Sequence, residues 1–142
     1  MKVFVALKPS WAMNGFEPYI SEQTMLVHWV QLHQKYVKNL NDMLKKYPNI
    51  SSISASEILR NPSAYFDNED DKMKYVNNMG GHFCHTLFWY CINPNPIKAP
   101  PDFWKAIGMN QKQLEAQLKA NGLSRFGSGW SWLALKHENT PD

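Results

Sequence analysis

The sequence predicts an α+β fold, in which a long N-terminal helical hairpin is followed by short helices and by the first strand of an incomplete C-terminal sheet. Apolar residues recur every three or four positions over residues 22–46, which predicts a helix with one buried face. A second apolar stretch, over residues 71–92, follows acidic residues and stops at Asn93-Pro94, as a second long helix would. Alternating side chains over residues 130–135 predict the strand.

Signals at the helix ends support these assignments. Ser21 is a candidate N-cap for the first long helix, and Pro48 ends that helix. Ser54 and Glu57 have the spacing of a capping box. They predict a short helix that ends near Arg60.

A proline-rich segment, residues 93–101, divides the chain into two expected domains. Residues 1–93 form the helical hairpin. Residues 94–142 contain a short helix at 102–109, a longer helix at 111–121 and the single strand, which needs a partner for its backbone groups. The longer helix is bounded by a capping box and a following glycine. These residues are Asn110, Gln113 and Gly122.

Composition excludes several classes of function. Of the 142 residues, 44% are hydrophobic, which is enough for a buried core. The net charge is +3 with scattered lysines and arginines, so a nucleic-acid-binding surface is not expected. No apolar run reaches transmembrane length, and the first residues lack a signal-peptide pattern. Cys84 and Cys91 lie about 10 Å apart along one helix, too far for a disulfide, and reduced thiols are typical of an intracellular protein.

Histidine is the residue type that points to chemistry. His28 lies in the first long helix and His85 in the second, each among apolar residues. Taken alone, either is more typical of a hydrogen-bonded core residue than of a ligand. Taken together on two packed helices, they predict two imidazoles that can bind one metal ion. His82 lies three residues before His85, a spacing that also permits chelation, whereas His33 is expected to turn away from His28 toward the surface.

Motifs of other catalytic classes are missing from the sequence. It has no Gly-x-Ser-x-Gly turn, no His-Glu-x-x-His pair and no phosphate-binding P-loop. A thiol nucleophile at Cys84 is disfavoured as well, because neighbouring residues on a helix, such as Cys84 and His85, do not face each other.

Three segments carry motifs in a fixed order. The first leads into and contains the first histidine, the second contains the second histidine, and the third leads into the predicted strand. They are Glu17-Pro18-Tyr19-Ile20-Ser21 with Thr24-Met25, His28, Tyr36-Val37 and Asn39-Leu40-Asn41; Gly80-Gly81-His82-Phe83-Cys84-His85 with Phe88-Trp89 and Asn93-Pro94; and Phe126-Gly127-Ser128-Gly129-Trp130-Ser131-Trp132-Leu133. In this arrangement the chain resembles the iron/manganese superoxide dismutases, over the first two-thirds of that family's fold.

The resemblance implies a cofactor and roles for named residues. The family binds one iron or manganese ion with three histidines, one aspartate and a solvent molecule, and the ion alternates between two oxidation states as superoxide becomes oxygen and hydrogen peroxide. His28 and His85 match two of the ligands. Tyr36 matches the tyrosine at the mouth of the substrate funnel. Trp130 matches an aromatic wall of the metal pocket, and Trp89 is expected to add to that wall.

The departures from the family pattern concern the rest of the site. The Asp-x-Trp-Glu-His-Ala-Tyr-Tyr type of motif that supplies the other aspartate and histidine ligands has no match, and His137 and Asp142 lack its spacing. Two residues near the ligands also differ from the family. Leu32, which precedes His33, occupies the position of a histidine that usually lines the funnel. Cys84 stands where asparagine is usual. Two imidazoles without a carboxylate make a poor iron or manganese site.

These departures favour a non-catalytic role. We expect a superoxide dismutase-like structural subunit of a larger mitochondrial, ribosome-like assembly, because the family has been recruited for that use. Other protein chains are then expected to complete the sheet at the free edge of residues 130–135. The alternative is an iron/manganese superoxide dismutase whose missing aspartate and histidine come from an absent or separate C-terminal segment, with iron or manganese bound once the site is complete. The expected location is mitochondrial, or otherwise cytoplasmic.

Overall fold

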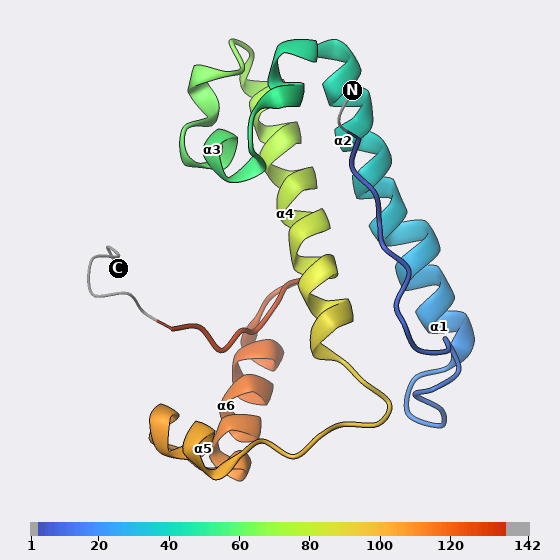
Figure 1. The fold of residues 1–142 in the computed structure, drawn as a ribbon, viewed down its shortest axis with the longest axis vertical. Coiled ribbons are helices and arrows are strands. Elements are labelled where there is room, and N and C mark those ends of the chain that lie inside the picture. Colours follow the sequence, from blue (N-terminus) through green and yellow to red (C-terminus); the bar gives the residue numbers. More distant parts are fainter. Residues whose placement is uncertain (1–2, 136–142) are drawn as a thin grey trace. The chain divides into compact units, whose positions relative to one another are not determined.

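The computed structural model describes residues 3–135, so that His137 and Asp142 lie outside the described residues (Figure 1). Contacts divide the chain into one unit that extends to Pro96 and a second that begins at Ile97. None of the described helices combines the length and the hydropathy that crossing a lipid bilayer requires. The helical elements are α1 (Glu22–Leu26), η1 (Val27–His33), α2 (Gln34–Lys46), η2 (Pro48–Ser52), α3 (Ala55–Arg60), η3 (Pro62–Ala64) and α4 (Glu69–Cys91) in the first unit, and α5 (Pro101–Ile107) and α6 (Gln111–Ser124) in the second.

The first long helix runs without a break through α1, η1 and α2, over the residues that the sequence predicts. Ser21 caps its start, where the hydroxyl oxygen accepts a hydrogen bond from the Thr24 N–H at 3.2 Å. The middle segment, η1, is π-helical. The helix ends where Tyr47 leaves helical geometry, directly before Pro48.

The second long helix, α4, begins at Glu69, slightly before the predicted start. Asn68 is its N-cap, and its side-chain oxygen accepts from the Asp71 N–H at 3.1 Å. Three acidic residues fill the first turn, where the helix dipole favours negative charge. The helix ends at Cys91, before Pro94.

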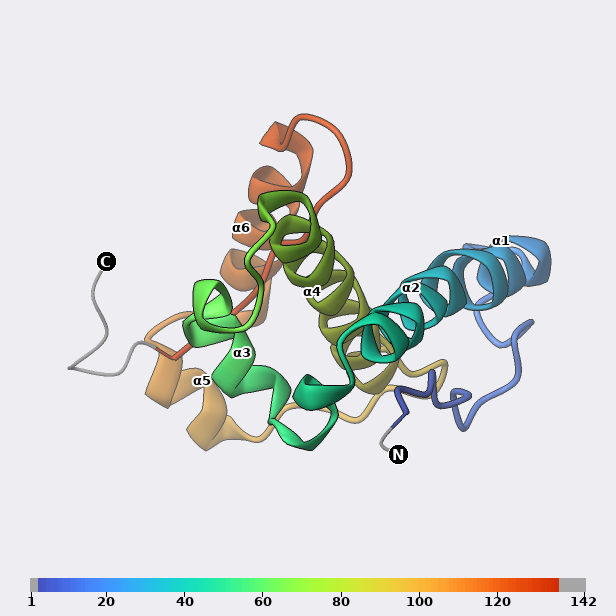
Figure 2. The ribbon, with the colours of Figure 1, turned by 90° about the horizontal axis from the view of Figure 1, so that it is seen from above.

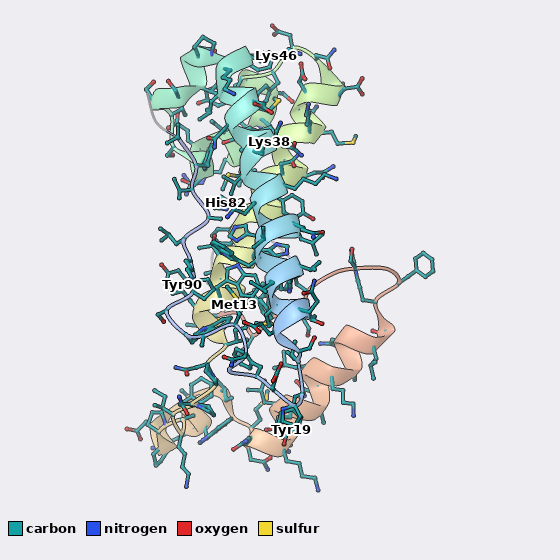
Figure 3. All side chains as sticks on the ribbon, turned by 90° about the vertical axis from the view of Figure 1, so that its right-hand side faces the viewer. Met13, Tyr19, Lys38, Lys46, His82 and Tyr90 are labelled. Atoms are coloured by element: carbon teal, nitrogen blue, oxygen red, sulfur yellow. The ribbon has the colours of Figure 1, made fainter. Side chains whose placement is uncertain are left out.

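The two long helices lie side by side and form the hairpin that the sequence predicts (Figures 1 and 2). One polar contact ties them together next to their connection. The Asp71 carboxylate accepts hydrogen bonds from the Lys46 ammonium and from the Tyr47 hydroxyl. These bonds, with the charge of Lys46, hold the pKa of Asp71 below its ordinary value. Lys46 lies at the end of the hairpin opposite Tyr19 (Figure 3).

Two apolar clusters fill the hairpin. The one nearer the connection contains Leu40 and Tyr75, which are both fully buried. The other contains Met13, Met25 and Trp89. Along both helices the buried histidines fall between these clusters, and Figure 3 shows His82 midway along the hairpin. Imidazoles, not aliphatic side chains, therefore occupy the middle of this core.

Residues 3–9 form an extended arm that runs beside the first long helix (Figure 1). Asn41 holds this arm, because its Oδ1 accepts from the Phe4 N–H at 2.8 Å and its Nδ2 donates to the Phe4 carbonyl at 3.0 Å. Trp29 Nε1 donates to the Leu7 carbonyl at 3.1 Å. These side-chain bonds satisfy backbone groups that an extended segment otherwise pairs in a sheet.

In the second unit, the capping box of α6 is confirmed. Asn110 accepts from the Gln113 N–H, and Gln113 accepts from the Asn110 N–H. The predicted helix end is wrong, because α6 continues through Gly122 to Ser124; a glycine inside a helix costs only about 1 kcal/mol. The preceding helix, α5, stops at Gly108, whose φ of 66° is left-handed and favours glycine.

The predicted strand is wrong. Residues 130–135 form no strand, and none occurs elsewhere in residues 3–135. Trp130 and Trp132 do lie on the same side, and their rings stack with centroids 5.4 Å apart. A strand, however, requires a neighbouring backbone for its hydrogen bonds, and the described part of the chain pairs no segment with this one. The described residues are therefore all-α, and the start of a sheet is absent from them.

Tyr75 provides a test of the hairpin packing. Its ring is fully buried, and its hydroxyl has no hydrogen-bond partner among the described residues. Burial alone raises its pKa to about 12. Because a buried hydroxyl without a partner costs roughly 1–3 kcal/mol, Tyr75→Phe should leave the free energy of unfolding unchanged or raise it by about 1 kcal/mol. Urea unfolding measures this change.

Tyr47→Phe is the matched control for this variant. It also removes a tyrosine hydroxyl, but one that donates a hydrogen bond to Asp71. Tyr47→Phe should therefore lower the urea midpoint. If Tyr75→Phe lowered the midpoint as much as Tyr47→Phe does, the Tyr75 hydroxyl would have a partner in solution and the described packing would be contradicted.

Candidate metal centre

Two imidazoles from different helices meet at the candidate site. His28 comes from η1 and His85 from α4, and their ring centroids lie 4.9 Å apart with the planes at 85°. His85 is buried and His28 is half-buried. The structure thus brings together the two histidines that the sequence singles out as candidate ligands.

The π-helical segment η1 determines which side chains share this face. In an α-helix, side chains five residues apart point about 140° apart. In a π-helix the hydrogen bonds join residues five apart, as the bond from the Gln34 N–H to the Trp29 carbonyl does, so His28 and His33 lie on nearly the same side. His33 is only 1% exposed. The expectation that it turns toward the surface is therefore wrong, because that expectation assumed α-helical spacing.

Two hydrogen bonds hold His33 in the core. Trp89 Nε1 donates to its Nδ1 at 2.9 Å, and its Nε2 lies 2.8 Å from Nδ1 of His82. An indole nitrogen can only donate, so Nδ1 of the neutral His33 ring is the acceptor and Nε2 carries the proton. His33 then donates to His82, whose own proton lies on Nε2. A directed chain of hydrogen bonds thus runs from Trp89 through His33 to His82.

A backbone carbonyl fixes the tautomer of His85. Its Nδ1 lies 2.7 Å from the carbonyl oxygen of Gly81, one turn earlier in α4. A carbonyl can only accept, so Nδ1 carries the proton and Nε2 carries the lone pair of the neutral ring. Histidines that bind metals have this arrangement, in which one nitrogen holds the ring in place and the other is the ligand.

Burial keeps the four imidazoles in their neutral form near neutral pH. Desolvation is the main cause that lowers the pKa of His28, His82 and His85 below the ordinary value of 6.5. For His33, desolvation and then repulsion from the three neighbouring imidazoles lower the pKa to about 4. Neutral imidazole is the form that binds a metal ion. The electrostatics of the cluster therefore favour metal binding at neutral pH.

The separation of the two rings fits a shared ion. With a metal–nitrogen bond of about 2.1 Å and about 1.1 Å more to the ring centre, two imidazoles at roughly 90–120° on one ion have centroids roughly 4.5–5.5 Å apart. The 4.9 Å between His28 and His85 falls in this range. Within residues 3–135, however, no group of three or more His, Cys, Asp or Glu side chains is placed to hold an ion. The described residues thus fit a metal as a partial site that needs further ligands.

Aromatic side chains lie against both imidazoles. The Trp89 ring contacts His28 with centroids 4.9 Å apart, and the Tyr36 ring contacts His85 with centroids 5.3 Å apart. These are the neighbours expected of a pocket-wall tryptophan and of a funnel tyrosine, although the roles themselves stay predictions. Trp130 belongs to the second unit, and its place in the wall also stays a prediction.

Leu32 lies beside an open pocket of about 370 Å³ that His28 also lines, with Gln23, Thr24 and Val27. The Leu32 side chain is 49% exposed. The pocket next to the candidate ligand is therefore apolar at the position where the resembling family has a histidine.

The sequence pointed to His82 but not to its bond with His33, and it did not reveal that the Gly81 carbonyl orients His85. The short spacing between His82 and His85 suggested a shared metal ion, but His82 bonds to His33 instead. The π-helical segment that makes this contact possible leaves no mark in the apolar pattern. Cys84 is half-buried, and burial raises the pKa of its thiol. A raised pKa agrees with the view that Cys84 is not a thiolate nucleophile.

Because His33 is buried, we expect the free energy of unfolding of the chain to depend on pH. Between about pH 6.5 and about pH 4 the unfolded chain binds a proton at this position that the folded chain does not. Stability is thus fully present above pH 6.5 and falls as the pH drops toward 4, by roughly 3 kcal/mol if the whole window is crossed. The urea midpoint should therefore be lower at pH 5 than at pH 7.

Two variants test whether His33 causes this pH dependence. His33→Gln should reduce the difference between the two midpoints. Lys38→Gln is the control, because Lys38 pairs with Asp42, whose pKa of about 2 lies below the window. Equal pH dependence in the parent chain and in His33→Gln would contradict the described burial of His33.

Comparison with known proteins places these features in a family. Residues 6–93 match the model of a protein family described as "Iron/manganese superoxide dismutases, alpha-hairpin domain". A manganese superoxide dismutase of Leptolyngbya boryana is 38% identical over 123 residues, which cover 84% of this chain and 49% of that protein. One of Thermus thermophilus is 37% identical over 124 residues, with 84% and 60% covered. One of Bacillus anthracis is 35% identical over 142 residues, with 97% and 67% covered.

The chain therefore spans between about half and two thirds of the length of these curated relatives. The matched family domain is the helical hairpin that carries His28 and His85. The chain belongs to the iron/manganese superoxide dismutase family.

Proposed function

We propose that this chain supplies half of the metal site of an iron or manganese superoxide dismutase. His28 and His85 are two of the ligands. An aspartate and a third histidine come from a C-terminal segment, in the same polypeptide or in a separate one. The edge-to-face approach of the two imidazoles carries this proposal, because their 4.9 Å separation suits one shared ion.

When bound, iron or manganese supplies one-electron redox chemistry for a reaction in which two superoxide ions and two protons give one oxygen and one hydrogen peroxide. The residues of this chain then have three tasks. They hold the ligands in orientation, they line the approach of a small anion, and they limit the access of water.

Orientation comes from the nitrogens that do not bind the ion. The Gly81 carbonyl holds His85 through Nδ1. His33 stacks on His85 with centroids 5.4 Å apart, and the bond from Trp89 prevents His33 from turning. Because the His85 ring is fixed before any ion binds, less conformational freedom is lost when it becomes a ligand.

The path by which an anion would reach the site differs at position 32 from the usual pattern of the family. Leu32 has neither a hydrogen-bond donor nor an acceptor, so it cannot transfer a proton to an incoming anion. Tyr36 lies against His85, and its hydroxyl can donate a hydrogen bond. We assign to Tyr36 the contact with superoxide and peroxide, while Trp89 and the core around it keep water from the inner side of the ligands.

A second candidate function is a non-catalytic subunit of a larger assembly, such as a mitochondrial ribosome-like particle. The outer side of α4 favours it, because Phe83, Leu87 and Tyr90 are 55%, 36% and 72% exposed and share one helix face. Exposed apolar side chains in a row are typical of a surface that another chain covers. Docking at residues 130–135 and a mitochondrial location belong to this candidate and stay predictions.

Metal content tests the dismutase proposal. We expect the chain, joined to the C-terminal third of the Bacillus anthracis relative, to bind close to one manganese or iron ion and to consume superoxide. His28→Gln and His85→Gln should each lower the metal content at least about ten-fold, because each removes an imidazole ligand. Elemental analysis after dialysis and a superoxide-consumption assay provide the two readouts.

Lys38→Gln is the control here too, since it removes an exposed charge from α2 and should change neither readout. A joined protein that holds no iron or manganese would contradict the proposal and favour the non-catalytic candidate. Undiminished metal content in both histidine variants would contradict the assigned ligands.

A further inference from the structure

We propose that the arm formed by residues 3–9 is a gate that opens and closes over a cavity while the two long helices stay folded. The cavity lies beside the hydrogen bond that Trp89 Nε1 donates to His33. The closed arm separates this bond from bulk water, and the open arm admits water to the inner side of the candidate site. The consequence for a metal site rests on the proposed function, but the gate itself does not.

The cavity lies between the arm and the long helices. Its volume is about 90 Å³, and Leu7 and Pro9 of the arm line it together with His33, Thr86 and Trp89 of the helices. A space of this size can hold at least one water molecule. Because the arm and His33 line the same cavity, the arm is part of the cover that leaves His33 only 1% exposed.

Side chains of the first long helix hold the arm closed. Asn41 makes two hydrogen bonds with the backbone of Phe4, at 2.8 and 3.0 Å. Trp29 Nε1 donates to the Leu7 carbonyl at 3.1 Å. The Phe4 ring also lies edge-on against the His82 imidazole, with centroids 5.8 Å apart. Removal of one side chain, that of Asn41, therefore deletes two of the bonds that keep the arm in place.

The arm buries little of its own surface. Val3, Val5 and Leu7 are 57%, 58% and 61% exposed. Among residues 3–9, only Ala6 and Pro9 are buried. Segments with few buried apolar contacts open at a lower free energy than the core of a domain does. We therefore expect the arm to open well before the hairpin unfolds.

Opening of the arm would change the surroundings of the bond that orients His33. Water that enters can accept a hydrogen bond from Trp89 Nε1 and donate one to Nδ1 of His33. His33 stacks on His85 with centroids 5.4 Å apart, so a less constrained His33 ring gives His85 more freedom. Under the proposed function, the gate thus controls when water reaches the inner side of a ligand. This route is separate from the pocket beside Leu32, because the two pockets share no lining residue.

Asn41→Ala and Asn39→Ala form a matched pair for the test, in the full metal-free chain. Both variants remove an asparagine side chain from α2, but Asn39 donates to Asn78 of α4, at 2.8 Å, and not to the arm. Hydrogen exchange at Trp89 Nε1, followed by NMR, reports the opening of the arm. Exchange at the amide of Tyr75, which is fully buried in α4, reports the unfolding of the hairpin.

The two variants should act on different protons. Asn41→Ala should speed exchange at Trp89 Nε1 at least about ten-fold, because it removes two hydrogen bonds that favour the closed arm. Asn39→Ala should leave the Trp89 rate unchanged and speed exchange at the Tyr75 amide, because it removes a bond between the two long helices.

Two results would overturn the proposal. One is a Trp89 rate in Asn41→Ala equal to that of the parent chain, since the arm would then not limit the access of water to the cavity. The other is an equal increase of the Trp89 rate in both variants, since Trp89 would then exchange only when the hairpin unfolds.

Urea provides a second test in the parent chain, which serves if Asn41→Ala does not fold. Low concentrations of urea should barely change exchange at Trp89 Nε1 and at the Phe4 amide, because opening of the arm exposes little surface. Exchange at the Tyr75 amide should rise steeply, because unfolding exposes the core. An equal dependence on urea at Trp89 and Tyr75 would overturn the proposal.

These experiments separate the gate from the function discussed above. They are performed without metal, so a negative result leaves the proposed metal site untouched. Conversely, failure of the joined protein to bind iron or manganese would refute the proposed function and leave the exchange results intact.

Discussion

The burial of His33 between the two long helices is the constraint on which the candidate site depends. With α-helical spacing through Val27–His33, His28 and His33 would point about 140° apart, and only one of them could face α4. The π-helical segment puts both on that face. A buried imidazole is costly unless its nitrogens are hydrogen-bonded, and Trp89 and His82 bond to both nitrogens of His33. The π-helical segment thus brings His33 into the core, and the hydrogen bonds to Trp89 and His82 offset the cost of burying it.

This arrangement explains how a helical hairpin can prepare a metal site without completing it. His28 and His85 are neutral, partly or fully desolvated, and at the separation that a shared ion requires. Iron and manganese also prefer a carboxylate and a higher coordination number. Asp42 and Asp71 are each engaged in an ion pair with a lysine of α2. Within residues 3–135 no carboxylate joins the two imidazoles in a group of three possible ligands, so under the proposed function it comes from another segment.

Much of the hairpin was predictable from the sequence, because local signals determine it. Ser21, Ser54 and Asn110 cap helices where expected, and the apolar spacing gave the buried face that includes Leu40. The depth of His33 was not predictable, because it depends on a helix type that side-chain periodicity does not encode. The strand at residues 130–135 was also wrong, since alternation describes side chains, whereas a strand needs a second backbone.

Whether the hairpin by itself brings His28 and His85 together is tested most directly by proton–proton cross-relaxation (NOESY) in the metal-free chain. With the histidine rings assigned, the described structure predicts cross-peaks between the ring protons of His28 and those of His85, and between the rings of His33 and His82. If the His28 ring showed cross-peaks only to its own helix, the two imidazoles would be apart in solution and the partial metal site would not exist.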